Sequence, residues 1–115
     1  MSDIKELTDR IIAFRDARNW KQFHNPKDLA ISLSLEAAEV MEHFQWKNAE
    51  EMAEHAVHKK EDIADELADV FYWVLLLSND LDIDIAEALR RKMEKNEAKY
   101  PEDKAKNSHA KYTEL

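Results

Sequence analysis

Apolar residues recur three and four positions apart along most of this chain, which is the spacing of one face of an α-helix. The pattern predicts long helices over about residues 3–18, 26–45 and 61–79, and a fourth from Asp82 or Asp84 to just before Pro101. A shorter polar helix is expected to begin after Asn48 and to lead into the third long helix. We therefore predict an all-α protein built as a four-helix-type bundle.

Residues that are favoured at helix starts mark two of these boundaries. Asn25 precedes Pro26, and these two residue types are preferred at the N-cap and at the first helical position. Asn48 and Glu51 have the spacing of a capping box. The connector between the first two helices is unusually aromatic, with Trp20, Phe23 and His24. An aromatic loop of this kind either lines a functional site or covers the end of the bundle, and the sequence leaves both interpretations open.

The second half of the third helix, residues 70–77, is apolar on nearly every side. Such a helix must be covered from several directions, and a short chain has few elements with which to do so. We therefore predict that a homo-oligomer, a dimer or a tetramer, completes the bundle. Residues 1–101 are expected to form a single helical domain, and residues 102–115 a polar C-terminal tail.

The composition narrows the classes of function that this chain could have. Its 115 residues include 25 acids and 17 basic residues, for a net charge of −8, with neither glycine nor cysteine. Without glycine there is no glycine-rich phosphate loop, and without cysteine there is no disulfide or thiolate site. The acidic balance argues against binding to nucleic acid or to an anionic membrane. No apolar run is long enough to span a membrane and the first residues are polar, so we expect a cytoplasmic protein.

Two helices each place a pair of acids beside their apolar stripe. Glu36 and Glu39 are three residues apart in the second helix, and Glu66 and Asp69 repeat this spacing in the third. At an effective dielectric near 20, two carboxylates about 4 Å apart repel each other by roughly 4 kcal/mol. A converging cluster is therefore stable only if a cation neutralises it. Oxygen ligands without Cys or His suit Mg²⁺, with Mn²⁺ as a second possibility.

Other interpretations of these acids remain open at this stage. They could pair with Lys or Arg at the rim of the bundle, and the residues Asp62, Asp65 and Asp69 form a competing acidic row. A di-iron or di-manganese bundle would require Glu-x-x-His, which is missing here, although His43 follows Glu39 by four residues. The His55-x-x-His58 spacing permits weak zinc binding but is more typical of a solvated polar helix.

Several ordered segments resemble a known family. The segments EAAEVMEHFQW over residues 36–46 and DELADV over residues 65–70 resemble the MazG-type, all-α nucleoside triphosphate pyrophosphohydrolases. The flanking RNWKQFH over residues 18–24, KMEKN over residues 92–96 and KYP over residues 99–101 place the chain near the small single-domain dCTP pyrophosphatase branch. The resemblance covers roughly residues 4–101.

The resemblance implies hydrolysis of a nucleoside triphosphate between its α- and β-phosphates. It places the metal ligands on Glu36, Glu39, Glu66 and Asp69, and we favour Glu39, beside Glu36, as the catalytic acid that orients the attacking water. It implies substrate contacts from Trp20, His24, Trp46, Trp73, Lys92 and Asn96. Two residues depart from the pattern, because Trp73 replaces a common tyrosine and Lys99 a common arginine. These changes put sugar discrimination and one phosphate contact in question.

We therefore predict a Mg²⁺-dependent pyrophosphohydrolase acting on dCTP or a related deoxynucleotide. The alternative from another class is a non-catalytic helical interaction module whose acids only keep it in solution. A third hypothesis is a hydrolase acting on an extended metabolite that contains a pyrophosphate group, which would share the metal site and not need the aromatic connector.

Overall fold

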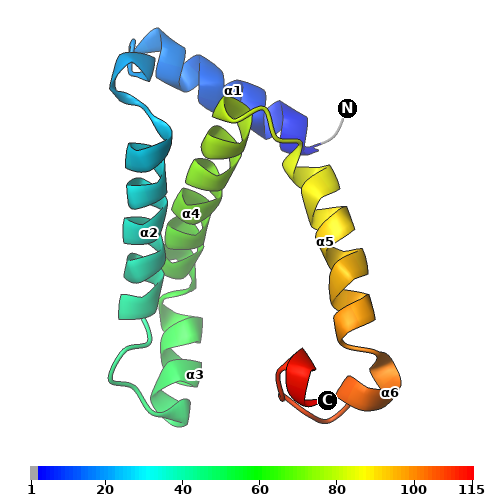
Figure 1. Cartoon of the computed structure of the whole chain (residues 1–115). Coiled ribbons are helices and arrows are strands. Elements are labelled where there is room, and N and C mark those ends of the chain that lie inside the picture. The colour runs from blue at the N-terminus through cyan, green and yellow to red at the C-terminus, as the bar shows by residue number, and fades with distance from the viewer. Residues whose placement is uncertain (1–2) are drawn as a thin grey trace. The chain divides into compact units, whose positions relative to one another are not determined.

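The computed structural model describes residues 3–115, and these residues form helices and loops with no β-strand among them (Figure 1). This confirms the predicted all-α class. The described helices are α1 (Asp3–Ala17), α2 (Pro26–Glu42), α3 (Ala49–His58), α4 (Lys60–Asp80), α5 (Ile85–Lys99) and α6 (Glu102–Ala105), with short 3₁₀ turns at Lys21–Phe23 and Tyr112–Glu114. None of them is both long and apolar enough to cross a membrane.

The starts of three helices are fixed by side-chain caps. The Asn25 side chain accepts a hydrogen bond from the Asp28 backbone N–H at 2.9 Å, with Pro26 at the first helical position. Asn48 and Glu51 form the predicted capping box at α3. Asp84, rather than Asp82, caps α5. These caps satisfy backbone donors that have no partner within the helix, which is why the starts could be predicted.

The helix ends follow a different rule, because the chain has no glycine to terminate them. Positive φ angles, which glycine adopts most readily, occur at Asn19, Trp46, Asp82 and Asn107. The helix α2 ends at Glu42, three residues before the predicted end near Gln45. Its last turn tightens, since the backbone N–H groups of the next two residues bond to carbonyls only three residues back. The chain then reaches Trp46 at φ 69°.

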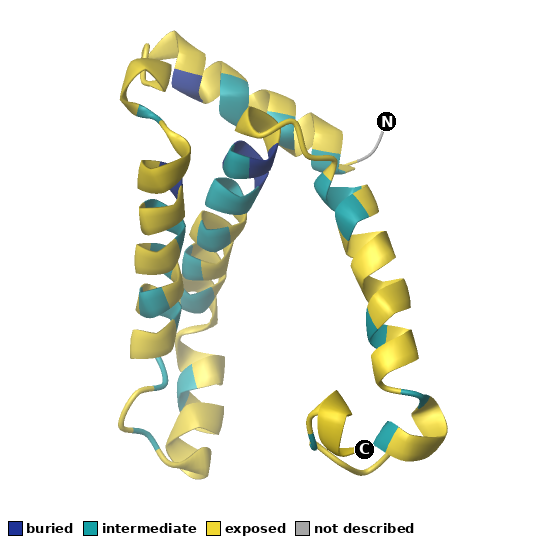
Figure 2. Ribbon diagram, in the orientation of Figure 1, coloured by how far each residue is buried: buried dark blue, intermediate teal, exposed yellow. Residues whose placement is uncertain are grey.

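The helices α2 and α4 pack along each other, and α1 packs against α4. The fully buried apolar residues are few: Leu29 of α2, with Leu75 and Leu76 of α4. Figure 2 shows that the buried positions gather where α1 and the start of α2 meet the end of α4. The middle of α4 is much less covered, with Leu67 53% exposed and Phe71 partly exposed. A single copy of the chain therefore leaves part of the apolar α4 surface open.

The chain divides into two compact units, the first ending at Asp82 and the second comprising Ile83–Leu115. In the second unit the C-terminal residues return to the end of α5. The Tyr100 and Tyr112 rings meet edge to face at 6.0 Å, and the Lys99 ammonium lies 4.8 Å from the centre of the Tyr112 ring. The predicted division into a domain over 1–101 and a tail over 102–115 stays a prediction.

Candidate functional site

Three carboxylates converge between α2 and α4. One oxygen from each of Glu36, Glu39 and Glu66 lies within 4.8 Å of the oxygens from the other two. We call these three residues the acidic cluster. They meet because Glu36 lies on the face of α2 that carries Leu29 and Leu33, and Glu66 on the face of α4 that carries Val70. The fourth predicted ligand, Asp69, is exposed and lies outside this group.

The acidic cluster contains buried oxygens without partners. Oε2 of Glu36 and Oε2 of Glu66 are buried and accept no hydrogen bond, whereas Glu39 is exposed. Among residues 3–115, no ion pair involves any of the three carboxylates. The alternative in which basic side chains at the rim neutralise these acids is therefore not observed there. Buried polar atoms normally have partners, so two buried carboxylate oxygens without partners in one cluster fit the binding of a cation.

The pKa values of the acidic cluster reflect this crowding. The pKa of Glu66 rises to about 7, because its protonated form can donate to the Glu39 carboxylate, burial disfavours its charge, and neighbouring carboxylates repel it. For Glu36 the main cause that raises the pKa is burial, followed by the hydrogen bond and the charge of the neighbouring Glu39. Asp69 contributes to both shifts, so it lies within electrostatic reach of the acidic cluster. All-oxygen donors of this kind fit a hard divalent cation.

A cavity of about 440 Å³ adjoins the acidic cluster and is lined by Glu39, Glu42, His43, His55 and Glu66. Nδ1 of His43 and Nε2 of His55 are 2.9 Å apart, a hydrogen bond that ties α3 to the end of α2. Burial and the nearby Lys47 lower the pKa of His55. His58 lies instead 3.9 Å from Glu54, so the His55-x-x-His58 spacing does not bring its two rings to one partner.

The predicted aromatic substrate contacts lie in three places. His24 and Trp73 lie together, with ring centres 5.8 Å apart, and Tyr72 packs against Trp73. Trp20 packs edge to face on Phe14 at 5.6 Å and stays partly exposed. Trp46, in the turn after α2, is 91% exposed. The remaining predicted contacts, Lys92 and Asn96, are four residues apart on α5 and so share one face of that helix.

Sequence reasoning missed an ion pair beside His24 between a buried arginine and a partly covered aspartate. Arg15 of α1 is 1% exposed, and its guanidinium makes two hydrogen bonds to the Asp80 carboxylate of α4, at 2.7 and 3.0 Å. The position of Arg15 in the sequence could have indicated that it is buried, because it follows Leu7 and Ile11 at intervals of four residues on the apolar side of α1. A charged residue in that row requires a partner from elsewhere in the chain.

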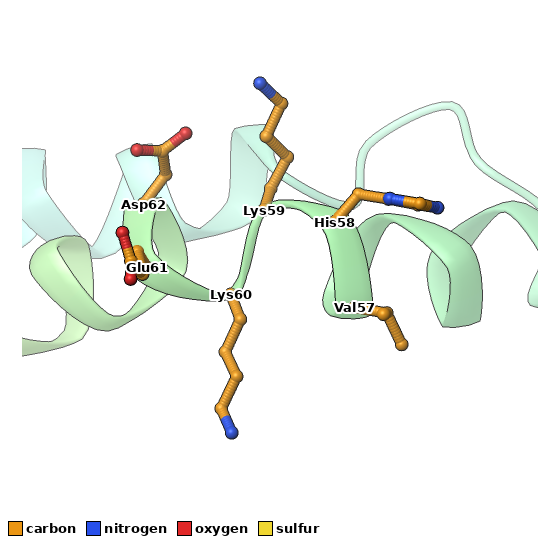
Figure 3. Close-up of a pocket in the computed structure, with 6 residues that line it drawn as sticks. All are labelled: Val57, His58, Lys59, Lys60, Glu61 and Asp62. Atoms are coloured by element: carbon orange, nitrogen blue, oxygen red, sulfur yellow. The ribbon is translucent and has the colours of Figure 1, made fainter.

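Two further surface pockets do not bring carboxylates together as the acidic cluster does. One, of about 410 Å³ at the α3–α4 junction, is lined by Val57, His58, Lys59, Lys60, Glu61 and Asp62. Its side chains diverge, with Lys59 and Lys60 pointing in opposite directions (Figure 3). The other, of about 300 Å³, lies between α1 and Tyr72 of α4 and is lined mainly by apolar side chains.

Comparison with known proteins places these features in context. A family model described as the MazG-like family matches residues 31–115. The chain is 36% identical to the dCTP pyrophosphatase 1 proteins of Rattus norvegicus and Homo sapiens, over all of this chain and 67% of each relative. It is also similar to the crystal structure of a pyrophosphatase from Archaeoglobus fulgidus, with 43% identity and a TM-score of 0.83. That match covers 88% of this chain and 94% of the archaeal chain.

Proposed function

The chain belongs to the MazG-like family, and we propose that it is a Mg²⁺-dependent enzyme that hydrolyses dCTP or a related deoxynucleoside triphosphate to a monophosphate and pyrophosphate. Family membership confirms the resemblance noted in the sequence, and the similarity to pyrophosphatases supports assignment as a nucleotide pyrophosphatase. The observation that carries the proposal is the acidic cluster, with its two buried and unpartnered carboxylate oxygens.

The residues of the acidic cluster suit distinct roles. Glu36 and Glu66, whose free oxygens are buried, would hold the cation, and Asp69 would add a carboxylate from the next turn of α4. The exposed Glu39 would orient the water that attacks the phosphorus atom. Mg²⁺ bound there would neutralise phosphate charge and lower the pKa of a coordinated water. A P–O bond would form between the water oxygen and the attacked phosphorus, while the bond from that phosphorus to the oxygen bridging the α- and β-phosphates breaks. The leaving phosphate would keep the bridging oxygen, and the water would release a proton.

Recognition of the nucleoside is assigned to the aromatic side chains. Trp20, Trp46 and Trp73 supply faces on which a base can stack, and His24 supplies a polar ring beside Trp73. Trp73 stands where the family commonly has a tyrosine, so the tyrosine hydroxyl that could contact the sugar is missing. We therefore propose weak discrimination between ribose and deoxyribose at this position. Lys92 and Asn96 would contact the nucleotide from α5.

We also propose that the working form is a homo-oligomer, a dimer or a tetramer. The partly exposed Leu67 and Phe71 on α4 support this, since monomeric proteins seldom leave apolar side chains of a central helix uncovered together. Residues 1–101 are retained as the proposed catalytic domain, with 102–115 as its tail.

The test is pyrophosphate release from a panel of deoxynucleoside and nucleoside triphosphates, with Mg²⁺, with Mn²⁺ and with a chelator. We expect equal amounts of pyrophosphate and monophosphate, with dCTP among the better substrates and no turnover after chelation. Glu61→Gln, an exposed acid at the start of α4 and outside the acidic cluster, is the matched control for Glu39→Gln. Turnover that persists in chelator, or no release from any nucleotide, would contradict the proposal.

A further inference from the structure

The ion pair between the buried Arg15 and the partly covered Asp80 carboxylate also contacts a third residue. Arg15 comes from α1 and Asp80 from the end of α4, 65 residues later. The Nη1 atom that donates to Asp80 at 2.7 Å also lies 3.4 Å from Nδ1 of His24. The pair therefore joins three segments of the first unit: α1, α4 and the aromatic connector.

This contact constrains the protonation of His24. A guanidinium has only N–H donors, so Nδ1 of His24 must face it as an acceptor. The proton of the neutral ring then resides on Nε2. A second proton on Nδ1 would face the positive charge of Arg15, and burial together with Arg15 lowers the pKa of His24. Asp80 is the other charged group that acts on this ring, and it opposes that shift.

The free side of the ring lies near the residue that we assign to the nucleoside. The His24 and Trp73 rings meet at 66° with their centres 5.8 Å apart. No hydrogen-bond partner for Nε2 of His24 occurs in the part of the chain that the structure describes. His24 is therefore held from one side and keeps a single N–H donor available on the other.

We propose that Arg15 and Asp80 are positioning residues that hold His24 as an Nε2–H donor beside Trp73, so that His24 selects a hydrogen-bond acceptor on the nucleotide. The acceptor class comprises a base carbonyl oxygen, a ring nitrogen or a phosphate oxygen. The inference rests on the proposed function, which supplies the nucleotide. The positioning itself is a property of the ligand-free protein and can be measured there.

The discriminating variant replaces the ion pair with apolar side chains. In Arg15→Met combined with Asp80→Leu, neither charge is left buried without a partner, so the fold is expected to survive. His24 should then populate both tautomers, and its pKa should move towards the ordinary value. We expect KM for the nucleotide to rise about fivefold, the factor that one neutral hydrogen bond contributes, with kcat little changed. Arg15→Lys, which keeps a charge for Asp80, is a second variant should the double substitution unfold.

Two measurements separate this role from a purely structural one. Nitrogen-15 NMR of the histidine rings reports the tautomer without any substrate, and Leu75→Val is the control that disturbs only the core. An Nδ1–H tautomer in the parent protein would overturn the positioning. If the double variant is folded but less stable, and its His24 spectrum and KM are unchanged, the ion pair only stabilises the fold and the proposal is overturned. If the tautomer changes as expected but no nucleotide is hydrolysed, the positioning holds and the proposed function fails.

Discussion

Removing one carboxylate from the acidic cluster should affect stability in opposite directions with and without metal. Glu66→Gln keeps the size of the side chain and removes a charge that faces Glu36 and Glu39 within 4.8 Å. In the metal-free protein this relieves repulsion, because the raised pKa of Glu66 shows that its ionised form is disfavoured there. In the presence of Mg²⁺ the same change removes a proposed ligand, so the stabilisation by metal should be lost.

The size of the effect follows from linkage. A ligand at one hundred times its Kd stabilises the folded state by about 2.7 kcal/mol. A chain of 115 residues unfolds with an entropy of about 240 cal/mol/K, so this corresponds to a rise in Tm of about 11 °C. If Glu66→Gln weakens binding about a hundredfold, the same Mg²⁺ concentration supplies about 0.4 kcal/mol, or about 2 °C.

The assay is thermal unfolding at pH 8, first in chelator and then across a Mg²⁺ titration, for the parent protein, Glu66→Gln and the control Glu61→Gln. We expect Glu66→Gln to melt no lower than the parent in chelator and to respond least to Mg²⁺, while the control follows the parent. A parent protein whose Tm ignores Mg²⁺, or a variant that gains as much as the parent, would refute the argument that the acidic cluster binds a cation.

Three further outcomes follow from the same geometry. Glu39→Gln should lower kcat, measured by pyrophosphate release, at least about a hundredfold. It should not lower the Tm, measured by thermal unfolding in chelator. Near-normal turnover would exclude Glu39 from the mechanism. The folded-state pKa of Glu66, about 7, lies above its ordinary value of 4.5, so the free energy of unfolding without metal should fall as pH rises between these values. Denaturant unfolding in chelator at several pH values measures this free energy, and a rise over that range would contradict the prediction. Trp46→Gly should stabilise the turn by about 1 kcal/mol, because glycine adopts a positive φ angle without the strain that tryptophan has there. The same change should raise KM for the nucleotide about fivefold or more, because stacking on the base is lost. A stable variant with normal KM would exclude Trp46 from binding.

The helix starts could be predicted because each is a local event. Asn25, Asn48 and Asp84 satisfy backbone donors within three residues of themselves, so their signals are complete in a short stretch of sequence. The end of α2 at Glu42 lacked such a signal. The chain leaves the helix through a tightened turn and places a tryptophan at positive φ, where glycine or asparagine would be expected.

The convergence of Glu36, Glu39 and Glu66 could likewise be predicted from helical periodicity, since it depends only on which faces of two long helices carry these residues. Asp69 was the exception, because spacing places it near the others but does not determine whether its oxygen turns inward. Two polar contacts around the site could not be predicted from the sequence, for another reason. Arg15 meets Asp80 across 65 residues and His43 meets His55 across a turn, and neither spacing carries a pattern until the helices are packed.

The absence of glycine and the surplus of acids bear on the same problem, which is how this chain can hold a triphosphate. Glycine-rich loops bind phosphate through backbone N–H groups that approach closely, and this chain has no glycine with which to build one. Phosphate charge must then be met by basic side chains or by a cation that the protein holds. The acidic cluster contains no ion-paired carboxylate among the described residues and keeps two buried oxygens free. In a chain with net charge −8, carboxylates that recruit a divalent cation turn an acidic surface into one that can accept a polyanion.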